Sequence, residues 1–145
     1  MSLYSDIIRS SQTAFTNKLS QYTIYFDDNI PETPDDKFIN IKFQLLNDLE
    51  QKTMLESNDE ATFQQPLLIS FECKQSIGTA SSWRYDVIFD IQEILNNRTI
   101  FQSELTLVRQ KTIFEAKSST NKSDIYNLAV LEALFYIRSR RIITL

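Results

Sequence analysis

The side chains that could carry chemistry are mostly carboxylates, and the most closely spaced of them form two pairs. Asp27-Asp28 and Asp35-Asp36 enclose a segment that also contains Pro31 and Pro34. Paired carboxylates can bind a divalent cation, or one can act as an acid while the other acts as a base. The segment lacks the glycine and the terminal glutamate of a calcium-binding loop. We therefore interpret both pairs as solvated turn residues and predict no metal site.

The composition excludes most other catalytic chemistry. The chain has 145 residues but no histidine, one cysteine (Cys73) and one glycine (Gly78). Without histidine there is no Ser-His or Cys-His dyad and no His-ligated metal, and a single glycine cannot build a phosphate-binding loop. A single cysteine also excludes zinc knuckles and internal disulfides. We predict a protein that is not an enzyme and uses no cofactor, in which Cys73 is a small packing residue.

The charge balance argues against a nucleic-acid-binding surface. Fifteen Lys and Arg residues against nineteen Asp and Glu residues give a net charge of −4, which opposes the broad neutralisation of phosphates. One dense basic cluster, Arg138, Arg140 and Arg141, lies near the end of the sequence. It could contact phosphate or the carboxylates of a neighbouring subunit, or it could be a solvated chain end.

The elements that must position these residues begin with a helix. Apolar residues recur every three to four positions from Leu3 to Leu19, which predicts an amphipathic helix. Strands are predicted over 21–26, which is rich in Tyr, Thr and Ile, and over 38–46, where polar and apolar residues alternate. Between them, residues 27–36 should form an acidic loop, because two prolines fix φ and Asp and Asn favour turns.

Residues 47–65 are the charged stretch of the chain. Six of its nineteen residues are Asp, Glu or Lys, and few apolar residues interrupt them. Such a stretch cannot contribute a core element, so it predicts a long charged loop or hairpin that orders against a partner. Its candidate contact residues are Glu50, Lys52, Met54 and Leu55, and we add the basic cluster at 138–141 to this candidate interface.

The middle of the chain predicts a buried strand over 67–74 and then a turn at Gly78. From Trp83 to Leu95 two periodicities conflict, since alternation favours a strand and a second set of apolar residues favours a helix. We predict the helix, because serines that could cap it precede it, Asp86 lies near its positive end, and Asn96 can end it in the left-handed geometry. The apolar stripe of this helix comprises Val87, Ile88, Ile91, Ile94 and Leu95.

The aromatic residues could form a base-stacking surface or the core. With few cations beside them, we assign to the core the residues Trp83, Tyr85, Phe89, Tyr126, Phe135 and Tyr136.

The last third of the chain predicts two strands joined by a polar turn over 118–124. The first, over 100–117, should be bent or bulged where Arg109, Gln110 and Lys111 interrupt the apolar pattern. The second, over 125–143, is apolar on both faces through most of its length, which suits either a central strand or a buried helix. We favour the strand.

Together these elements predict one α+β domain over 1–145. It would have a single mixed or antiparallel sheet of about five strands, with two helices packed on it, one at the N-terminus and one after Gly78. No apolar run approaches the roughly 20 residues of a membrane span, and no signal peptide opens the sequence. We expect a soluble protein that is made inside the cell.

This order of elements resembles that of the tail-terminator proteins of long-tailed phages, the lambda-type family. The likeness is in element order and turn placement: the opening helix, then Thr23-Ile24-Tyr25-Phe26-Asp27-Asp28-Asn29 leading through Pro31 and Pro34 into a strand, and later the turn Ile77-Gly78-Thr79 before a helix and two closing strands. The single glycine and the high charge of 47–65 depart from many relatives.

The resemblance implies a structural protein of the virion, at the head-proximal end of the tail. Six copies would form a ring that caps the tail tube, ends tube polymerisation and offers a joining surface to the head-completion or connector protein. DNA would pass through the ring without specific binding, and a negative bore would not retard it. The partners implied are further copies of the chain and the tail tube protein, against which residues 47–65 would order.

A second resemblance implies a different class of protein. The chain is also similar to the lipoprotein partner of the lipopolysaccharide translocon, a periplasmic binding or assembly factor. That likeness requires a strand at 83–91 and a helix at 125–142, and it requires a lipidated cysteine that the sequence does not have near Met1.

Overall fold

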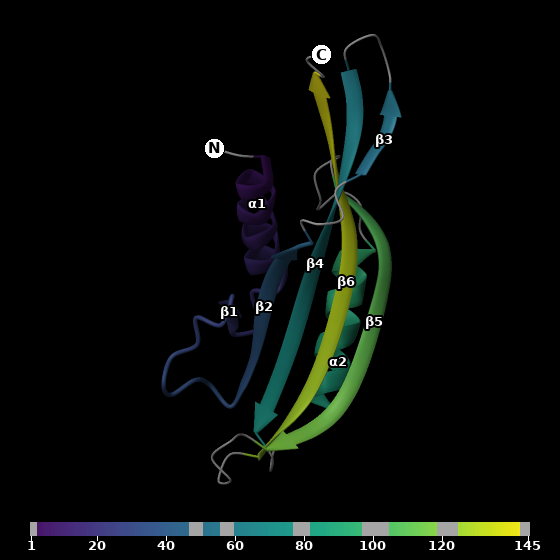
Figure 1. Ribbon diagram of the computed structural model, residues 1–145. Coiled ribbons are helices and arrows are strands. Elements are labelled where there is room, and N and C mark those ends of the chain that lie inside the picture. The colour runs from purple at the N-terminus through teal and green to yellow at the C-terminus, as the bar shows by residue number, and fades with distance from the viewer. Residues whose placement is uncertain are drawn as a thin grey trace.

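The protein has an α+β fold in which two helices pack on a mixed sheet (Figure 1). The computed structural model describes residues 3–46, 51–55, 60–76, 82–96, 105–118 and 125–142, with the backbone alone described at 3, 51–55, 60–63, 115–118, 125–126 and 138–142. The elements are α1 (Leu3–Lys18), β1 (Ile24–Phe26), β2 (Lys37–Leu45), β3 (Gln51–Leu55), β4 (Glu60–Ser76), α2 (Trp83–Leu95), β5 (Leu105–Ser118) and β6 (Ile125–Ile142).

The sheet runs in the order β1-β2-β4-β6-β5, with β1 parallel to β2 and every other pair antiparallel. The fold class is therefore the one predicted from the sequence. Since β6 pairs with the whole of β4 along one edge, β2 and β3 must share the other edge, so β3 continues the line of β2. The strands β1 and β5 form the two ends of the main path.

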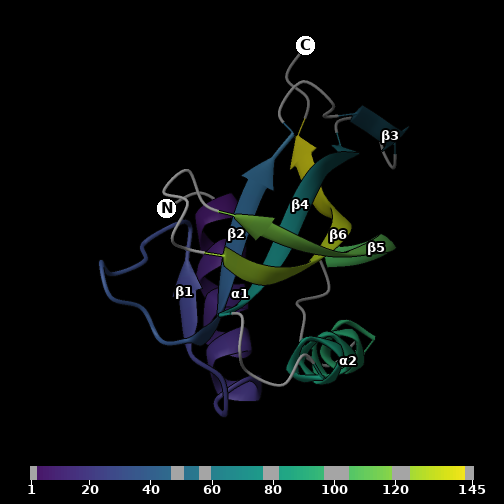
Figure 2. The same ribbon diagram turned by 90° about the horizontal axis from the view of Figure 1, so that it is seen from below.

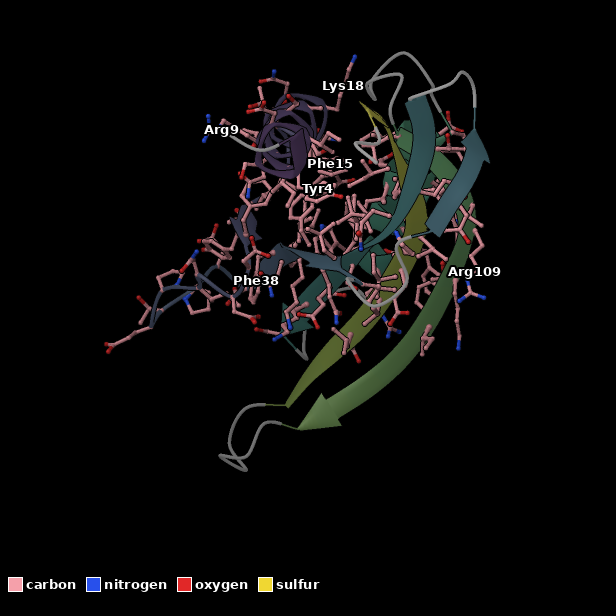
Figure 3. The ribbon with its side chains drawn as sticks, turned by 45° about the horizontal axis from the view of Figure 1, so that its top comes forward. Tyr4, Arg9, Phe15, Lys18, Phe38 and Arg109 are labelled. Carbon is pink, nitrogen blue, oxygen red and sulfur yellow. The ribbon has the colours of Figure 1, made fainter. Side chains whose placement is uncertain are left out.

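Both helices cover the same face of the sheet (Figure 2). Phe15 of α1 points toward the sheet in Figure 3, whereas Arg9 points away from it. The Phe15 ring meets the ring of Phe71 edge-on, with 5.1 Å between the centroids. Successive strand residues face opposite sides, so alternate residues of β2, β4 and β6 enter this core, and they include Cys73. Cys73 is buried there as predicted, and this burial raises the pKa of its thiol.

The charged stretch at 47–65 is not a loop throughout. Residues 51–55 form β3, which pairs antiparallel with residues 61–64 of β4, and a bulge between Lys52 and Met54 shifts the register. Of the two predicted alternatives for 47–65, the loop is wrong for residues 51–55 and 60–64, and the hairpin describes them. Charged residues are compatible with such a strand because only one strand, β4, pairs with β3 among the described residues.

Pro66 lies inside the long strand β4, at the point where β2 ends. Its carbonyl accepts a hydrogen bond from the Leu46 N–H at 3.0 Å, and the buried Gln65 side chain donates to the Leu46 carbonyl at 2.9 Å. A proline has no N–H to give to a neighbouring strand, so it is tolerated where the β2 ladder stops. The sequence thus allows β4 to continue past the helix-covered part of the sheet.

The helix predicted between Trp83 and Leu95 is present, but its ends differ from the prediction. The Ser82 side chain makes no capping hydrogen bond, and Asn96 ends the helix with φ −81°, outside the left-handed region. Gly78 lies outside the described residues. Residues 125–142 form a strand, as we favoured. The second resemblance requires the opposite element at both 83–91 and 125–142, so we do not carry it further.

The strand β5 has the predicted irregularity, a register shift between Leu107 and Arg109. Among the described residues, β5 pairs with β6 as far as Ile137, and from this point on β6 lies beside residues 60–65 of β4. We call β3, residues 60–65 of β4 and residues 137–142 of β6 the arm. Figure 1 shows the arm extending past both helices.

Candidate functional site

The first distinctive surface is the acidic segment, residues 27–36, which projects beside β1 (Figure 1). It opens on two residues in the left-handed region, Asp27 with φ 50° and Asp28 with φ 64°. The Phe43 N–H donates to Asp27 Oδ1 at 3.1 Å, and the Asp27 N–H donates to the carbonyl of Ile41 at 2.9 Å. The carboxylate therefore occupies the position of a neighbouring strand at the edge of β2. Strained backbone of this kind persists only where surrounding bonds enforce it.

A buried amide anchors this turn. Asn40 accepts a hydrogen bond from the Asp28 N–H at 3.1 Å, and its Nδ2 donates to Asp28 Oδ1 at 2.8 Å and to Glu72 Oε1 at 3.0 Å. Lys42 Nζ lies 3.2 Å from the Asp28 carboxylate and 3.5 Å from that of Glu72. The hydrogen bond from Asn40, aided by Lys42, holds the pKa of Asp28 below its ordinary value. The start of the segment is thereby fixed to the sheet.

A small hollow of about 300 Å³ lies where the acidic segment returns to the sheet. Its lining includes Tyr22, Trp83 and Lys37, together with Asp35, which accepts a hydrogen bond from Thr23 Oγ1 at 2.6 Å. The Tyr22 hydroxyl donates to the carboxylate of Asp90 on α2. Desolvation and this carboxylate raise the pKa of Tyr22 above its ordinary value. The hydrogen bond from Tyr22 connects the residues that precede β1 to α2.

The second distinctive surface lies at the opposite end of the sheet, on α2 and β5. Every large hydrophobic side chain recorded as exposed within the described residues belongs to one of these two elements: Tyr85, Phe89, Val108, Ile113 and Phe114. The rings of Tyr85 and Phe114 lie 4.8 Å apart, and the Arg84 guanidinium lies over both, 5.6 and 5.8 Å from their centroids. We call Arg84, Tyr85, Phe89 and Phe114 the β5 surface. Arg109 and Lys111 lie on the other face of β5, because they pair with Leu134 and Glu132, whereas Phe114 pairs with Ala129, which faces the helices.

The core assignment of the aromatic residues is wrong for two of them. Phe135 is buried as predicted and Trp83 and Tyr136 are half-buried, but Tyr85 is 54% and Phe89 59% exposed. At about 100° per residue, these two side chains fall on the side of α2 opposite its apolar stripe. The predicted helix therefore already indicates that these two rings face outward. The side chain of Tyr126 lies outside the described residues.

The structure brings the two groups of predicted contact residues together. Lys52, Met54 and Leu55 are on β3, and Arg138, Arg140 and Arg141 are on β6. One strand separates them, since residues 61–64 of β4 pair with β3 on one side and with residues 138–141 on the other. Both groups therefore belong to the arm. Glu50 lies outside the described residues.

Two further chemical features can be stated for the described part of the chain. No group of three or more Asp, Glu, Cys or His side chains gathers there in a way that could hold a metal ion. Neither of its helices is both long and apolar enough to cross a bilayer. The Asp35-Asp36 pair lines the hollow beside β1 together with Lys37, a cation.

Comparison with known proteins identifies the fold but no family. No protein-family model matches the chain, and no curated protein matches its sequence. A solved structure that carries only a serial designation superposes on it with a TM-score of 0.59 at 11% sequence identity, covering 94% of this chain and 96% of that chain. At this identity the likeness is one of fold alone. Because it spans nearly all of both chains, the whole arrangement of helices and sheet is similar to that of a known protein.

Proposed function

We propose that this protein is a structural subunit of a phage tail, which closes into a ring on the end of the tail tube, ends tube polymerisation and offers a joining surface to the head. The observation that carries this proposal is the pair of unlike exposed surfaces at the two ends of the sheet. One is the acidic segment beside β1, and the other is the aromatic surface on α2 and β5, over which the Arg84 guanidinium lies.

A ring needs two different surfaces on each subunit, because each copy contacts the next one head to tail. A symmetric dimer would need only one self-complementary surface. The element order supports the same reading, since a helix stands at 83–95 and two long strands close the chain, as in the phage proteins that the sequence resembles. In that family the ring has six copies, and DNA passes through it.

The arm is the part of the subunit best suited to reach the tube. It carries both groups of predicted contact residues, and it extends beyond the two helices (Figure 1). Strand ends that extend outside the core add little to the stability of the fold, and their edges are available to pair with other chains.

Capping of tubes tests the proposal. The purified protein, mixed with tubes of its cognate tail tube protein, should form rings at one end of each tube and stop elongation, as seen by electron microscopy and light scattering. Tubes that keep growing with the protein in excess, and that carry no ring, would reject the proposed function.

Shortening the arm should separate folding from capping. Replacing residues 51–61 by a short polar linker removes β3 and the first residues of β4, outside the helix-covered core. We expect the unfolding transition to stay within a few degrees of the original, while ring formation on tubes is lost. Full capping by this variant would assign the tube contact to another part of the subunit.

A further inference from the structure

The described helices cover only one face of the sheet. In β6, the residues that enter the helix-covered core alternate with Val130, Glu132 and Leu134, which lie on the other face. All three are only half-buried. A strand that is apolar on both faces is typical of a sheet that is covered on both faces. Among the described elements, neither helix lies on the second face (Figure 2), so apolar surface remains there for a partner to cover.

The strand β5 extends this second face and makes its rim basic. Three exposed residues of β5 lie opposite those residues of β6 and share their face: Arg109, Lys111 and Ile113. Two cations and one carboxylate give the area a positive charge, although the chain as a whole has a net charge of −4. The uncovered face, as we call it, comprises Arg109, Lys111, Ile113, Val130, Glu132 and Leu134.

The exposed side of α2 has the complementary composition. Tyr85 and Phe89 are more than half exposed, and Asp86 and Glu93 are exposed beside them. At about 100° per residue, all four fall on the side of the helix opposite its apolar stripe. The only cation of α2, Arg84, is half-buried and lies over the Tyr85 ring, 5.6 Å from its centroid. We call Tyr85, Asp86, Phe89 and Glu93 the outer face of α2, and this face is aromatic and acidic.

These two surfaces cannot meet within one chain. The apolar stripe of α2 lies in the core on one face of the sheet. The outer face of α2 is therefore directed away from the sheet, whereas the uncovered face lies on the other side of the sheet. Figure 2 shows α2 on one side of β5 and β6. Two unlike surfaces that point in opposite directions suit a contact between copies in which each copy uses both.

We infer that the outer face of α2 in one copy packs on the uncovered face of the next copy. The two aromatic rings cover the apolar residues of β5 and β6, and the two carboxylates face Arg109 and Lys111. Each sheet then has helices on both faces, which is one of the common arrangements of layers in domains.

This contact rests on the proposed ring function and gives it a specific geometry. It is head to tail, because the two surfaces differ, and repetition of one such contact closes a ring when the rotation between copies permits. The charges oppose the two symmetric alternatives, α2 on α2 and uncovered face on uncovered face, because like charges would meet in each.

A charge-swap experiment tests this contact. The first variant, R109E/K111E, makes the uncovered face acidic, and the second, D86K/E93K, makes the outer face of α2 basic. Each variant alone should lose self-association by at least about tenfold, since like charges then oppose each other. Mixed in equal amounts they should assemble again, because every contact in an alternating ring pairs opposite charges.

The matched control is R9E/K18E on α1, which changes the net charge as much as the first variant. Arg9 and Lys18 are exposed and belong to neither surface, and both lie apart from Arg109 (Figure 3). The control should assemble like the original protein. Sedimentation of each sample over a range of concentrations gives the comparison, with circular dichroism to verify folding. If D86K/E93K does not fold, E93K alone replaces it, since Asp86 lies in the first turn of α2, where a cation is unfavourable.

Chemical crosslinking gives a second measurement that does not depend on reversed charges. The single native cysteine, Cys73, is buried in the core, so only introduced cysteines should react with a short bis-maleimide. Chains with E93C and chains with K111C should form a crosslinked dimer when they are mixed, and neither should do so by itself. A mixture that gives no crosslinked dimer would overturn the contact.

The outcomes separate this contact from the proposed function. If either charge variant self-associates like the original protein, or if the mixture fails to recover, the contact is wrong, while capping of tubes by the original protein still supports the ring. If R109E/K111E self-associates normally but no longer caps tubes, the uncovered face contacts the tube protein, and the contact between copies is again wrong. If the original protein fails to cap tubes, the proposed function is wrong, and crosslinking at high concentration still decides whether the two surfaces meet. Crosslinking in each cysteine variant alone would instead indicate a symmetric contact and overturn the head-to-tail geometry.

Discussion

The two ends of the sheet are finished in different ways. At the β1 end, residues that flank β1 extend its three-residue pairing with β2: the Thr23 carbonyl accepts from the Ile39 N–H at 2.9 Å, and the Asp27 carboxylate accepts from the Phe43 N–H. At the β5 end, a strand of 14 residues carries a bulge and exposed apolar side chains, and no described strand covers its outer edge. We call the first end closed because the chain itself bonds the β2 edge there, and the second end open because its exposed apolar side chains are features of a surface that a partner completes.

The largest expected difference between the two ends comes from the same truncation made at each. Phe38 on β2 is only 7% exposed, packs edge-on against Tyr25 at 5.2 Å and lies below the Lys74 ammonium. We expect Phe38→Ala to lower the free energy of unfolding by about 3 kcal/mol. Phe114 is 41% exposed, so Phe114→Ala should cost less than about 1 kcal/mol. Urea denaturation of both variants measures this difference.

Phe38→Leu serves as the control for the first variant, since it restores most of the lost apolar volume and should recover more than half of the loss. Equal losses at Phe38 and Phe114 would mean that the β5 end contributes to the core as much as the β1 end. The comparison between a closed and an open end would then be wrong.

The buried amide at the β1 end should have the next largest effect. Asn40→Leu keeps the approximate volume but leaves the Asp28 N–H and the Asp28 and Glu72 carboxylates without the bonds that Asn40 provides. We expect a loss of about 2 kcal/mol. Gln44→Leu, an exposed position on the same strand, should change stability by less than about 0.5 kcal/mol. If the two substitutions cost the same, the turn at Asp27-Asp28 is held by something other than this amide.

The sequence allowed most of the element order to be predicted, because alternation in β2 and the apolar stripe of α2 are strong local signals. For residues 47–65 it left a loop and a hairpin open, since the pairing of residues 51–55 with 61–64 depends on β4 continuing past Pro66. It did not reveal the acidic segment as an anchored structure. The bonds from Asn40 to Asp28 and Glu72 join residues 12 and 32 positions apart, and no local pattern reports such contacts.

The candidate surfaces also include one feature that local sequence could predict and one that depends on distant contacts. The exposure of Tyr85 and Phe89 follows from the helix periodicity once the helix is accepted, so it could have been predicted. The packing of Phe114 on Tyr85 could not, because it depends on how α2 lies across β5.

A smaller effect is expected from the bond that joins the two ends. Tyr22→Phe removes the hydrogen bond to Asp90 on α2 but keeps the ring that meets Trp83 edge-on at 6.1 Å. We expect a loss of about 1 kcal/mol, below the range for buried bonds to charged groups because Tyr22 is only half-buried. Tyr85→Phe, on the exposed side of α2, should leave stability unchanged. A full loss from the Tyr85 variant would show that the β5 surface is more than a contact surface.

The smallest effect should appear only as a dependence on pH. The hydrogen bond from Asn40, with Lys42 beside it, lowers the pKa of Asp28 below 3.8, the value expected in the unfolded chain. A lowered carboxyl pKa stabilises the fold above the unfolded value, and this contribution is lost as the pH falls through the folded value. The side chain is 64% exposed, so solvent screens the interaction and keeps it small.

Asp28→Asn is a suitable comparison, since asparagine also tolerates the left-handed backbone. The difference in unfolding free energy between the original protein and this variant should be constant from pH 5 to 7, to within about the error of the measurement, and shrink below pH 3.8. In an Asn40→Leu background, where the main cause of the lowered pKa is gone, the same difference should depend less on pH. An unchanged pH dependence in that background would mean that Asn40 does not set the charge state of the turn, and the closed end of the sheet would need another explanation.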